Sequence, residues 1–398
     1  MGIRRAFRWF LIVLAGVVVA LFGFVWFGPV TIGDKHVLLD FVLGRGIAPP
    51  SIAEAAARLT VADGYRLEVY SNDVPLARWP LATSAGDLIV SRTRAGAVVV
   101  LERDRNGDGR PDGTRTLLDG LSHPHGLALH DGWLYVGELT GIGRIRFDEA
   151  TGRASGRYEK IVDDLTGDGF HQTKTIGFDA DGWLYVSQGS SCNVCIERDE
   201  RRATIMRMRP DGTQREIYAR GLRNSVGFDW APWDGALYAT ENGRDLLGDD
   251  FPPDELNRIE RGKFYGWPFI NGFGVADPNL GAGHEVQAAR AVPPVHDFRP
   301  HNAPLGIRFL RGEHLPAGYE RTALVALHGS WNRSNPDGYK VVALDWKPDG
   351  SIVERDFLTG FLGPQGLIGR PAGITQGPDG VVYVTDDYAG VVYRLVPR

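Results

Sequence analysis

The feature that most constrains this sequence is a short unit, a tight turn followed by an apolar run, that recurs along most of the chain. Four copies begin with Asp-Gly, and two weaker ones keep the apolar run. The copies are Ala85–Val90, Asp131–Val136, Asp181–Val186, Asp234–Ala239, Arg321–Ala326 and Asp379–Val384. They follow one another at roughly 50 residues, with one gap near 90, and such a period is typical of propeller blades built from four short strands. The sequence therefore predicts an all-β, six-bladed β-propeller.

The turn and the run have separate physical roles. Asp-Gly supplies the positive φ angles that a tight hairpin turn needs. An apolar run without alternation indicates a strand covered on both faces, as between neighbouring blades. Further strand-like runs follow most copies, for example Ala97–Leu101 and Thr204–Met208. The stretch 245–300 is rich in Gly and Pro with few such runs, so we expect a large, functional loop there. An irregular β-sandwich is the alternative fold.

The overall composition excludes one class of partner. The net charge is −5, so the chain has no surplus of basic residues that would indicate nucleic-acid binding. Glycine is abundant, with 52 of 398 residues, as expected for many short strands joined by tight turns.

The N-terminus predicts a membrane anchor. Arg4, Arg5 and Arg8 precede an uncharged run from Trp9 to Gly28, which as a helix would be about 30 Å long, the thickness of the hydrocarbon core. Basic residues before the run place the rest of the chain outside the cytoplasm. A cleaved signal peptide is the alternative. We expect an anchor over 1–30, a linker with short helical segments over 31–58, and the propeller over 59–398, with a single pass through the inner membrane and the propeller in the periplasm.

The two cysteines, Cys192 and Cys195, are the only ones in the chain. Zinc would need about four ligands, and covalent haem would need a His where Ile196 stands. In an oxidising compartment we expect a local disulfide, with free thiols or a redox role as alternatives.

Polar residues near the start of the predicted inner strands are the candidates for chemistry. His171 lies in a turn before a strand and could act as a general base near neutral pH. Cationic and amide side chains in similar places suit a carboxylated ligand, because Arg binds carboxylate bidentately. These candidates are Lys174, Arg223, Asn224, Arg299, His301, Arg333 and Arg370. Taken singly, each could equally face solvent or form a salt bridge.

Two segments resemble cation sites. The first has oxygen donors at the spacing of a calcium loop, although Arg115 stands where the last ligand, a Glu, is expected. Its donors are Asp104, Asn106, Asp108 and Asp112. The second is the acidic, Gly-bearing stretch 241–250, whose backbone carbonyls could hold Ca²⁺. A plain acidic turn is the alternative for both.

Four motifs follow the order seen in the soluble glucose and aldose dehydrogenases that use pyrroloquinoline quinone (PQQ), and this chain resembles them there. These motifs are Gly221-Leu222-Arg223-Asn224, Glu241-Asn242-Gly243, Asp254-Glu255-Leu256-Asn257 and Tyr265-Gly266-Trp267-Pro268. Three others resemble the sorbosone dehydrogenase branch: Ser190-Ser191-Cys192-Asn193, His328-Gly329-Ser330-Trp331-Asn332-Arg333 and Gly369-Arg370-Pro371. The resemblance covers about residues 60 to 398 and implies a six-bladed propeller that uses PQQ and Ca²⁺.

The resemblance also implies roles for single residues. His171 matches the family's base. Arg223, Asn224 and Arg370 match cofactor-binding residues. The family's cofactor-binding Lys in the fifth blade has no clear match; the loop Gly329–Arg333 replaces it, with Arg333 as the candidate substitute. The carbonyls of Gly243 and Arg244 match those that hold the cofactor's Ca²⁺, although the glucose dehydrogenases have Pro at the second position. No carboxylate partner for the base has an obvious match.

The implied chemistry is the oxidation of an aldose or a related sugar aldehyde. The base would take a hydroxyl proton, hydride would pass to the quinone, and Ca²⁺ would polarise the quinone carbonyl. Electrons would then pass to a respiratory acceptor, either a quinone or a cytochrome. The alternatives are a Ca²⁺-dependent propeller lactonase or hydrolase, and a non-catalytic propeller that binds a partner or a glycan.

Overall fold

The computed structural model describes residues 45–398 without a gap, together with ten isolated positions before them. These are Phe7, Trp9, Ala15, Gly16, Val19, Gly23, Lys35, Leu39, Asp40 and Leu43. The predicted anchor over 1–30 and most of the linker therefore lie outside the described residues. Among the residues that are described, no helix is both long and apolar enough to cross a bilayer.

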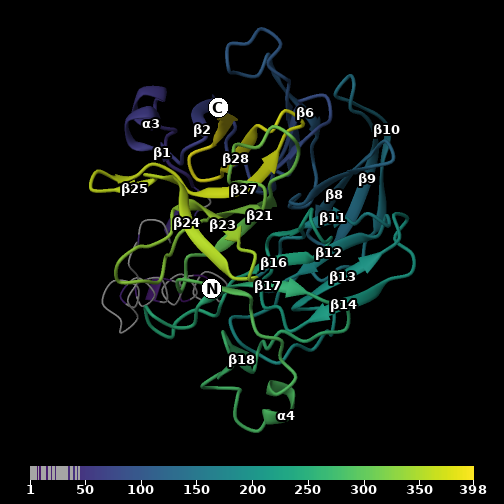
Figure 1. Cartoon of the computed structure of the whole chain (residues 1–398). Coiled ribbons are helices and arrows are strands. Elements are labelled where there is room, and N and C mark those ends of the chain that lie inside the picture. The colour runs from purple at the N-terminus through teal and green to yellow at the C-terminus, as the bar shows by residue number, and fades with distance from the viewer. Residues whose placement is uncertain are drawn as a thin grey trace.

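Six antiparallel sheets are arranged around a central channel (Figure 1), which confirms the predicted six-bladed propeller. From the innermost strand outward, the first three blades are β3 (Trp79–Ala82), β4 (Leu88–Arg92), β5 (Ala97–Leu101) and β6 (Thr114–Leu118); β7 (Leu127–His130), β8 (Trp133–Glu138), β9 (Gly141–Asp148) and β10 (Arg153–Val162); and β11 (Ile176–Phe178), β12 (Leu184–Gln188), β13 (Thr204–Met208) and β14 (Glu216–Arg220).

The other three blades follow the same order, with additions at their outer edges. They are β15 (Phe228–Trp230), β16 (Leu237–Glu241), β17 (Asp254–Ile259) and β20 (His296–Phe298); β21 (Pro304–Phe309), β22 (Thr322–Leu327), β23 (Lys340–Trp346), β24 (Ile352–Thr359) and β1 (Thr60–Val61); and β27 (Pro371–Gln376), β28 (Val382–Asp386), β29 (Val391–Pro397) and β2 (Tyr65–Ser71). A short hairpin, β25 (Leu362–Gly363) and β26 (Gly366–Leu367), precedes the last blade.

Each recurring unit is the turn between the innermost and second strands of one blade, together with that second strand. In the second blade only Asp131 and Gly132 lie between the paired residues His130 and Trp133. Their φ angles are 49° and 73°, which is the reason for Asp-Gly at this place. The second strands are fully buried in the third, fourth, fifth and sixth blades, in line with apolar runs covered on both faces.

The two ends of the described chain close the ring. β2 precedes the first blade in sequence, yet it pairs with β29 as the outer strand of the last blade, with Tyr65 opposite Pro397. β1 pairs with β24 in the fifth blade. Before them lies the short helix α3 (Ile52–Arg58), and Ser51 caps it by accepting a hydrogen bond from the Glu54 amide at 3.1 Å.

The strand order gives the channel two distinct ends. Each innermost strand begins after a connection from the preceding blade and finishes in the Asp-Gly turn or its equivalent. We call the first end the mouth end and the second the turn end. Connections between the second and third strands of a blade also lie at the mouth end, because neighbouring strands are antiparallel.

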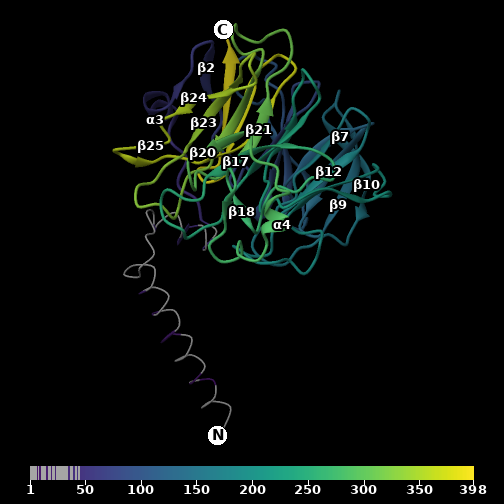
Figure 2. The same ribbon diagram turned by 60° about the horizontal axis from the view of Figure 1, so that its bottom comes forward.

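The stretch 245–300 is only partly a loop, so that part of the sequence prediction is wrong. It contains β17, whose residues are buried except for Arg258, and β20. The polar residues of β17 do not form the apolar pattern expected of a buried strand. They can be buried because hydrogen bonds satisfy their carboxylates: the Gly243 amide donates to Asp254 and the Gly272 amide donates to Glu255. The rest forms the hairpin β18 (Ile270–Asn271) and β19 (Val275–Ala276) and the short helix α4 (Glu285–Ala288), which lie at the rim of the propeller (Figure 2).

Candidate active site

His171 lies at the mouth end, in the connection from β10 to β11. Its Nδ1 is 3.0 Å from the carbonyl oxygen of Ser190 and 2.8 Å from the Ser190 Oγ. A carbonyl oxygen can only accept, so Nδ1 carries the proton and Nε2 keeps its lone pair. Burial, followed by the nearby charge of Arg223, lowers the pKa of His171 to about 3. The ring is therefore neutral at physiological pH, with Nε2 as the basic atom.

The loop that holds this ring is closed by a disulfide between Cys192 and Cys195, as predicted. The Ser190 hydroxyl donates to the Cys192 carbonyl at 2.8 Å. Gly189 lies directly behind the ring: a Cβ atom there would be 2.4 Å from the His171 Cβ and 3.0 Å from the Asn224 Oδ1. Glycine thus lets His171 and Asn224 lie next to each other.

Arg223 is buried and joins two mouth-end loops. Its guanidinium donates to the backbone and side-chain oxygens of Asn193, both at 2.9 Å, and to the carbonyls of Asn242 at 3.0 Å and Gly243 at 2.8 Å. It also pairs with Asp245 at 3.0 Å. The structure therefore places Arg223 as a clamp between these loops, and its predicted contact with a cofactor stays a prediction.

Of the two carbonyls predicted to hold a mouth-end Ca²⁺, that of Gly243 accepts a hydrogen bond within the protein. The Gly243 carbonyl accepts from Arg223, and the Gly243 amide donates to Asp254 at 2.8 Å. The side chain of Arg244 forms a buried ion pair with Asp277, at 2.8 and 3.0 Å. This pair ties the loop after β16 to the segment that follows β19.

At least one polar residue lies within four positions before the innermost strand of every blade, and we consider one such residue from each blade at the mouth end. They are Arg78, His125, Lys174, Asn224, His301 and Arg370. The sequence prediction named four of the six and missed Arg78 and His125. A search for polar residues just before each inner strand, in all blades, would have found both.

Lys174 and His125 form the most deeply buried part of this ring. The Lys174 ammonium donates to the Gln172 carbonyl at 2.9 Å, and burial, followed by the charge of Arg202, lowers its pKa to about 7. His125 is fully buried, and neither of its ring nitrogens has a hydrogen-bond partner. Unpaired buried nitrogens are costly, so they indicate a place where a further polar group is expected.

Arg370 lies beside a second buried cluster at the mouth end. Its Nε donates to the His328 carbonyl at 2.9 Å and its Nη2 to the Gly329 carbonyl at 2.8 Å. The His328 ring is 2.8 Å from Asp387, and Arg78 pairs with the same carboxylate at 2.6 Å. The sequence did not indicate that the His328 side chain and Asp387 would be in contact, because the two residues belong to blades that are separate in the sequence.

The other predicted cofactor residues hold the loop around 248–250. Arg333 donates to the carbonyls of Asp249 and Pro300. His301 bonds to the Gly248 carbonyl at 2.8 Å. Arg299 is 70% exposed and pairs with Asp337, so its side chain lies apart from the buried ring of the mouth.

The predicted calcium loop at 104–112 lies at the turn end, between β5 and β6, away from His171. The carboxylate of Asp104 accepts from the amides of Gly107, Asp108 and Gly109 and pairs with Arg394. Asn106 donates to Asp108, and Asp112 pairs with Arg105. Within the described part of the chain, the only three possible metal ligands whose donor atoms lie within 4.8 Å of one another are Cys192, Cys195 and Glu197, and the two sulfurs are already bonded together. Calcium at 104–112 stays a prediction.

Comparison with known proteins agrees with this architecture. Residues 135–394 match the glucose/sorbosone dehydrogenase family. The aldose sugar dehydrogenase YliI of Escherichia coli is 26% identical over 322 residues, which cover 73% of this chain and 80% of that protein. An uncharacterized protein of Borreliella burgdorferi is 38% identical over 217 residues, covering 53% of this chain and 56% of that relative.

A solved structure extends the likeness to the fold. The PQQ domain of pyranose dehydrogenase from Coprinopsis cinerea, in its holo form, superposes with a TM-score of 0.73 at 22% identity, and covers 86% of this chain and 97% of that one. At this identity the likeness supports the fold alone. The family match spans more than half of the sequence, from the second blade to the last, and the chain therefore belongs to the glucose/sorbosone dehydrogenase family.

Proposed function

We propose that this protein oxidises an aldose or a related sugar aldehyde, with PQQ as its bound electron acceptor. The observation that carries the proposal is the state of His171, a neutral imidazole at the channel mouth whose Nε2 keeps its lone pair. Such an atom can accept a proton from a sugar hydroxyl as the adjacent C–H bond breaks. Membership of the family supports this reaction class, as does the 34% identity over 129 residues with a PQQ-dependent pyranose dehydrogenase of Coprinopsis cinerea.

The residues at the mouth fit a flat polycarboxylate such as PQQ. Arg78, Lys174 and Arg370 provide cationic side chains there, and the carboxylate of Asp387 pairs with Arg78. The two unpartnered nitrogens of His125 can contact a further polar group. We propose that these residues and Asn224 hold the cofactor, which supplies the electron-accepting chemistry when bound. The chain itself binds the carboxylates, orients the sugar and takes the proton.

Calcium belongs to the same proposal. The carbonyls of Asn242 and Gly243 and the carboxylate of Asp245 surround the guanidinium of Arg223, and they are the hard oxygen ligands that Ca²⁺ prefers. Binding of Ca²⁺ by these oxygens therefore requires Arg223 to give up some of its contacts, and we expect apparent calcium affinity to rise in Arg223→Gln if the loop keeps its shape.

Reconstitution tests the proposed reaction. The purified full-length protein is mixed with PQQ and Ca²⁺, and reduction of a dye is followed with a panel of aldoses. We expect sugar-dependent reduction in the wild type. In His171→Gln we expect kcat to fall by about 10² to 10⁴-fold, the usual contribution of a general base, with PQQ binding retained. Absence of PQQ binding at micromolar concentration would contradict the proposal.

The remaining alternatives predict different results. A Ca²⁺-dependent hydrolase needs several carboxylates that converge on a metal in the channel. Among residues 45–398, no three carboxylates have oxygen atoms within 4.8 Å of one another. Hydrolysis of lactones without PQQ would favour it. A non-catalytic propeller would show neither activity.

The cellular setting is a further part of the proposal. The basic residues before the run Trp9–Gly28 support a single-pass anchor in the inner membrane, with the propeller in the periplasm. The disulfide supports an oxidising compartment. A periplasmic enzyme held at the membrane would pass electrons to a respiratory quinone or a cytochrome. Alkaline phosphatase fused after Arg398 would be active if the topology is as proposed and inactive if the C-terminus is cytoplasmic.

A further inference from the structure

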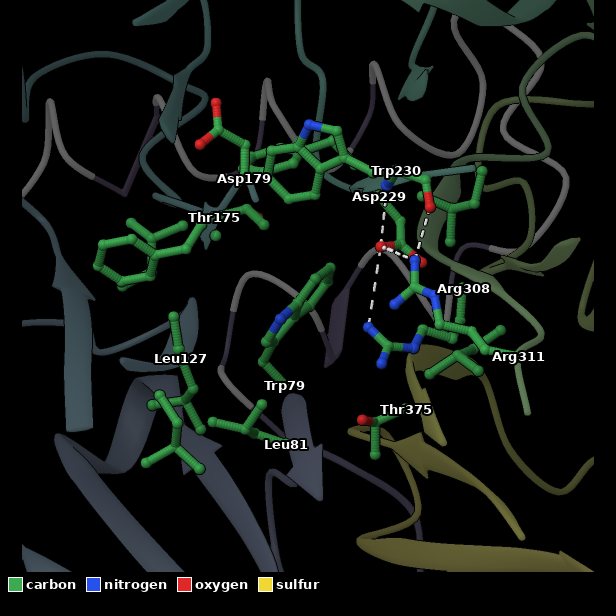
Figure 3. Close-up of a pocket in the computed structure, with 18 of the residues that line it drawn as sticks. Trp79, Leu81, Leu127, Thr175, Asp179, Asp229, Trp230, Arg308, Arg311 and Thr375 are labelled. Atoms are coloured by element: carbon green, nitrogen blue, oxygen red, sulfur yellow. Dashed lines mark hydrogen bonds and ion pairs between the residues drawn. The ribbon is translucent and has the colours of Figure 1, made fainter. Parts of the chain in front are cut away.

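The turn end of the central channel contains a cavity of about 440 Å³ that the proposed reaction does not use (Figure 3). Cavities of this size commonly bind small molecules. All six blades contribute to its wall, through Trp79, Leu127, Thr175, Trp230, Arg308 and Thr375. It is therefore a feature of the channel that all six blades share and not a gap between two loops.

The cavity is separated from the mouth by packed side chains. The ring of Trp79, which lines the cavity, lies against the ring of His125 with 4.8 Å between centroids, and His125 is fully buried. Thr175 also lines the cavity, and its hydroxyl donates to the Val226 carbonyl of the next blade. A molecule in this cavity would thus occupy a site distinct from that of His171.

Two arginines in the cavity share one carboxylate. Arg311 is close to Asp229, with Nη2 at 2.8 Å from Oδ1, and also donates to the Trp230 carbonyl at 2.6 Å. Arg308 is more weakly paired: its Nη1 is 3.8 Å from the same Oδ1, and its buried Nε has no partner. Burial lowers the pKa of Arg308 below its usual range.

Asp229 has little capacity left for Arg308. Its Oδ1 also accepts from the Trp230 amide and its Oδ2 from the Phe309 amide, both at 2.9 Å. The other acid on the cavity wall, Asp179, is held by the amides of its own turn, and Figure 3 shows its carboxylate turned away from the arginines. The arginine side of the cavity therefore has one positive charge in excess.

The opposite wall is apolar and aromatic. Trp79, Leu81 and Leu127 point into the space in front of the arginines (Figure 3). The side chain of Arg308 is 29% exposed, and this exposure is toward the cavity, where its donors can be reached. A guanidinium that faces an apolar wall suits an anion with a hydrophobic or ring-shaped body.

We propose that the turn end of the channel binds a small organic monocarboxylate, with its carboxylate on Arg308 and its body against Trp79 and Leu81. The site goes beyond the proposed oxidation and does not depend on it. Isothermal titration calorimetry with sodium benzoate and the full-length protein tests it. We expect saturable 1:1 binding, at least tenfold weaker in Arg308→Gln, and no saturable binding of neutral benzyl alcohol.

Two matched variants separate this site from other arginines. Arg321 lies over Trp233 at the same end, outside the cavity, and Arg370 lies at the mouth. Benzoate affinity should remain within twofold of wild type in Arg321→Gln and in Arg370→Ala. Loss of affinity in Arg370→Ala with none in Arg308→Gln would overturn the proposal, as would no saturable binding to the wild type at up to 50 mM benzoate (a limit of about 2 kcal/mol).

A second variant keeps the test decisive if Arg308→Gln fails to fold. Leu81→Phe adds volume on the apolar wall and leaves both arginines in place. We expect Leu81→Phe to weaken benzoate binding at least tenfold. Acetate, which has a methyl group in place of the phenyl ring, should bind to this variant as it does to the wild type. Unchanged benzoate affinity in a folded Leu81→Phe protein would refute this location.

Discussion

The hydroxyl of Ser190 connects the imidazole of His171 to the disulfide loop. Its Oγ is 2.8 Å from the His171 Nδ1 and donates to the Cys192 carbonyl, also at 2.8 Å. Because Oγ uses its own proton on that carbonyl, it must accept from Nδ1, as the Ser190 backbone carbonyl does. Two acceptors thus fix the same tautomer, and the tautomer determines that Nε2 is the basic nitrogen.

Replacement of Ser190 by Ala should weaken the preference of His171 for the tautomer with the proton on Nδ1, without removing that preference. The backbone carbonyl still accepts from Nδ1, so we expect kcat to fall by about tenfold, equivalent to the loss of one hydrogen bond. Affinity for PQQ should stay within a factor of three. Steady-state kinetics and a quinone titration measure the two effects, and a loss as large as that of His171→Gln would show that Ser190 does more than orient the ring.

The disulfide should matter more for activity than for stability. It closes a loop of only four residues, for which chain entropy gives about 2 kcal/mol. This loop contains Asn193, which holds Arg223, and it directly follows Ser190, which holds His171. We therefore expect the Cys192→Ser/Cys195→Ser variant to unfold at a slightly lower temperature and to lose most of its kcat.

The serine variant is preferable to chemical reduction, since a thiol reagent would react with the quinone in the assay. Scanning calorimetry and dye-reduction kinetics on the same preparation compare the two effects. Wild-type kcat together with a large drop in melting temperature would reverse the expected order and assign the disulfide to stability alone.

The buried ion pair Arg244–Asp277 should stabilise the fold by holding the loop after β16 against the segment that follows β19. Both side chains are at most 7% exposed. Removing one partner leaves a buried charge, which costs about 3 to 5 kcal/mol, whereas replacing both by apolar groups costs much less. Arg244→Met and Asp277→Leu should each lower the urea midpoint strongly, and the double variant less than the sum. Strict additivity in a double-mutant cycle would mean that the pair does not interact in solution.

The number of blades could be predicted because each blade repeats the same local requirement. Asp131 and Gly132 both have positive φ angles between two strands, and the residue pair Asp-Gly indicates such a turn directly in the sequence. The disulfide was predictable for a similar reason, since Cys192 and Cys195 are near neighbours in the chain. Closure of the ring by β2 was not, because Tyr65–Ser71 carries no turn signal and its partner β29 lies at the other end of the sequence.

The candidate site was only partly predictable, because it is assembled from all six blades. His171 and Arg370 were recognisable beside motifs, whereas His125, Arg78 and Asp387 acquire meaning only when the channel brings them together. Arg223 shows the opposite case: its motif was recognised, but its contacts with the loop at 242–245 could not be read from the sequence. Long-range pairing decides which cations stay available for a ligand.

The buried ammonium of Lys174 should make stability depend on pH. Its pKa is about 7 in the folded protein, below the usual 10.5, because of burial and of Arg202. Between these values the unfolded chain binds the extra proton, so stability is highest above pH 10.5 and falls as the pH drops toward 7. The apparent free energy of unfolding of the wild type relative to Lys174→Met should thus rise by up to about 1.4 kcal/mol per pH unit above 7. Urea titrations at pH 7, 8 and 9 measure this slope, with the exposed Lys347→Met as the control. A flat difference for Lys174→Met would show that the ammonium is solvated, and its place in the mouth would then need another explanation.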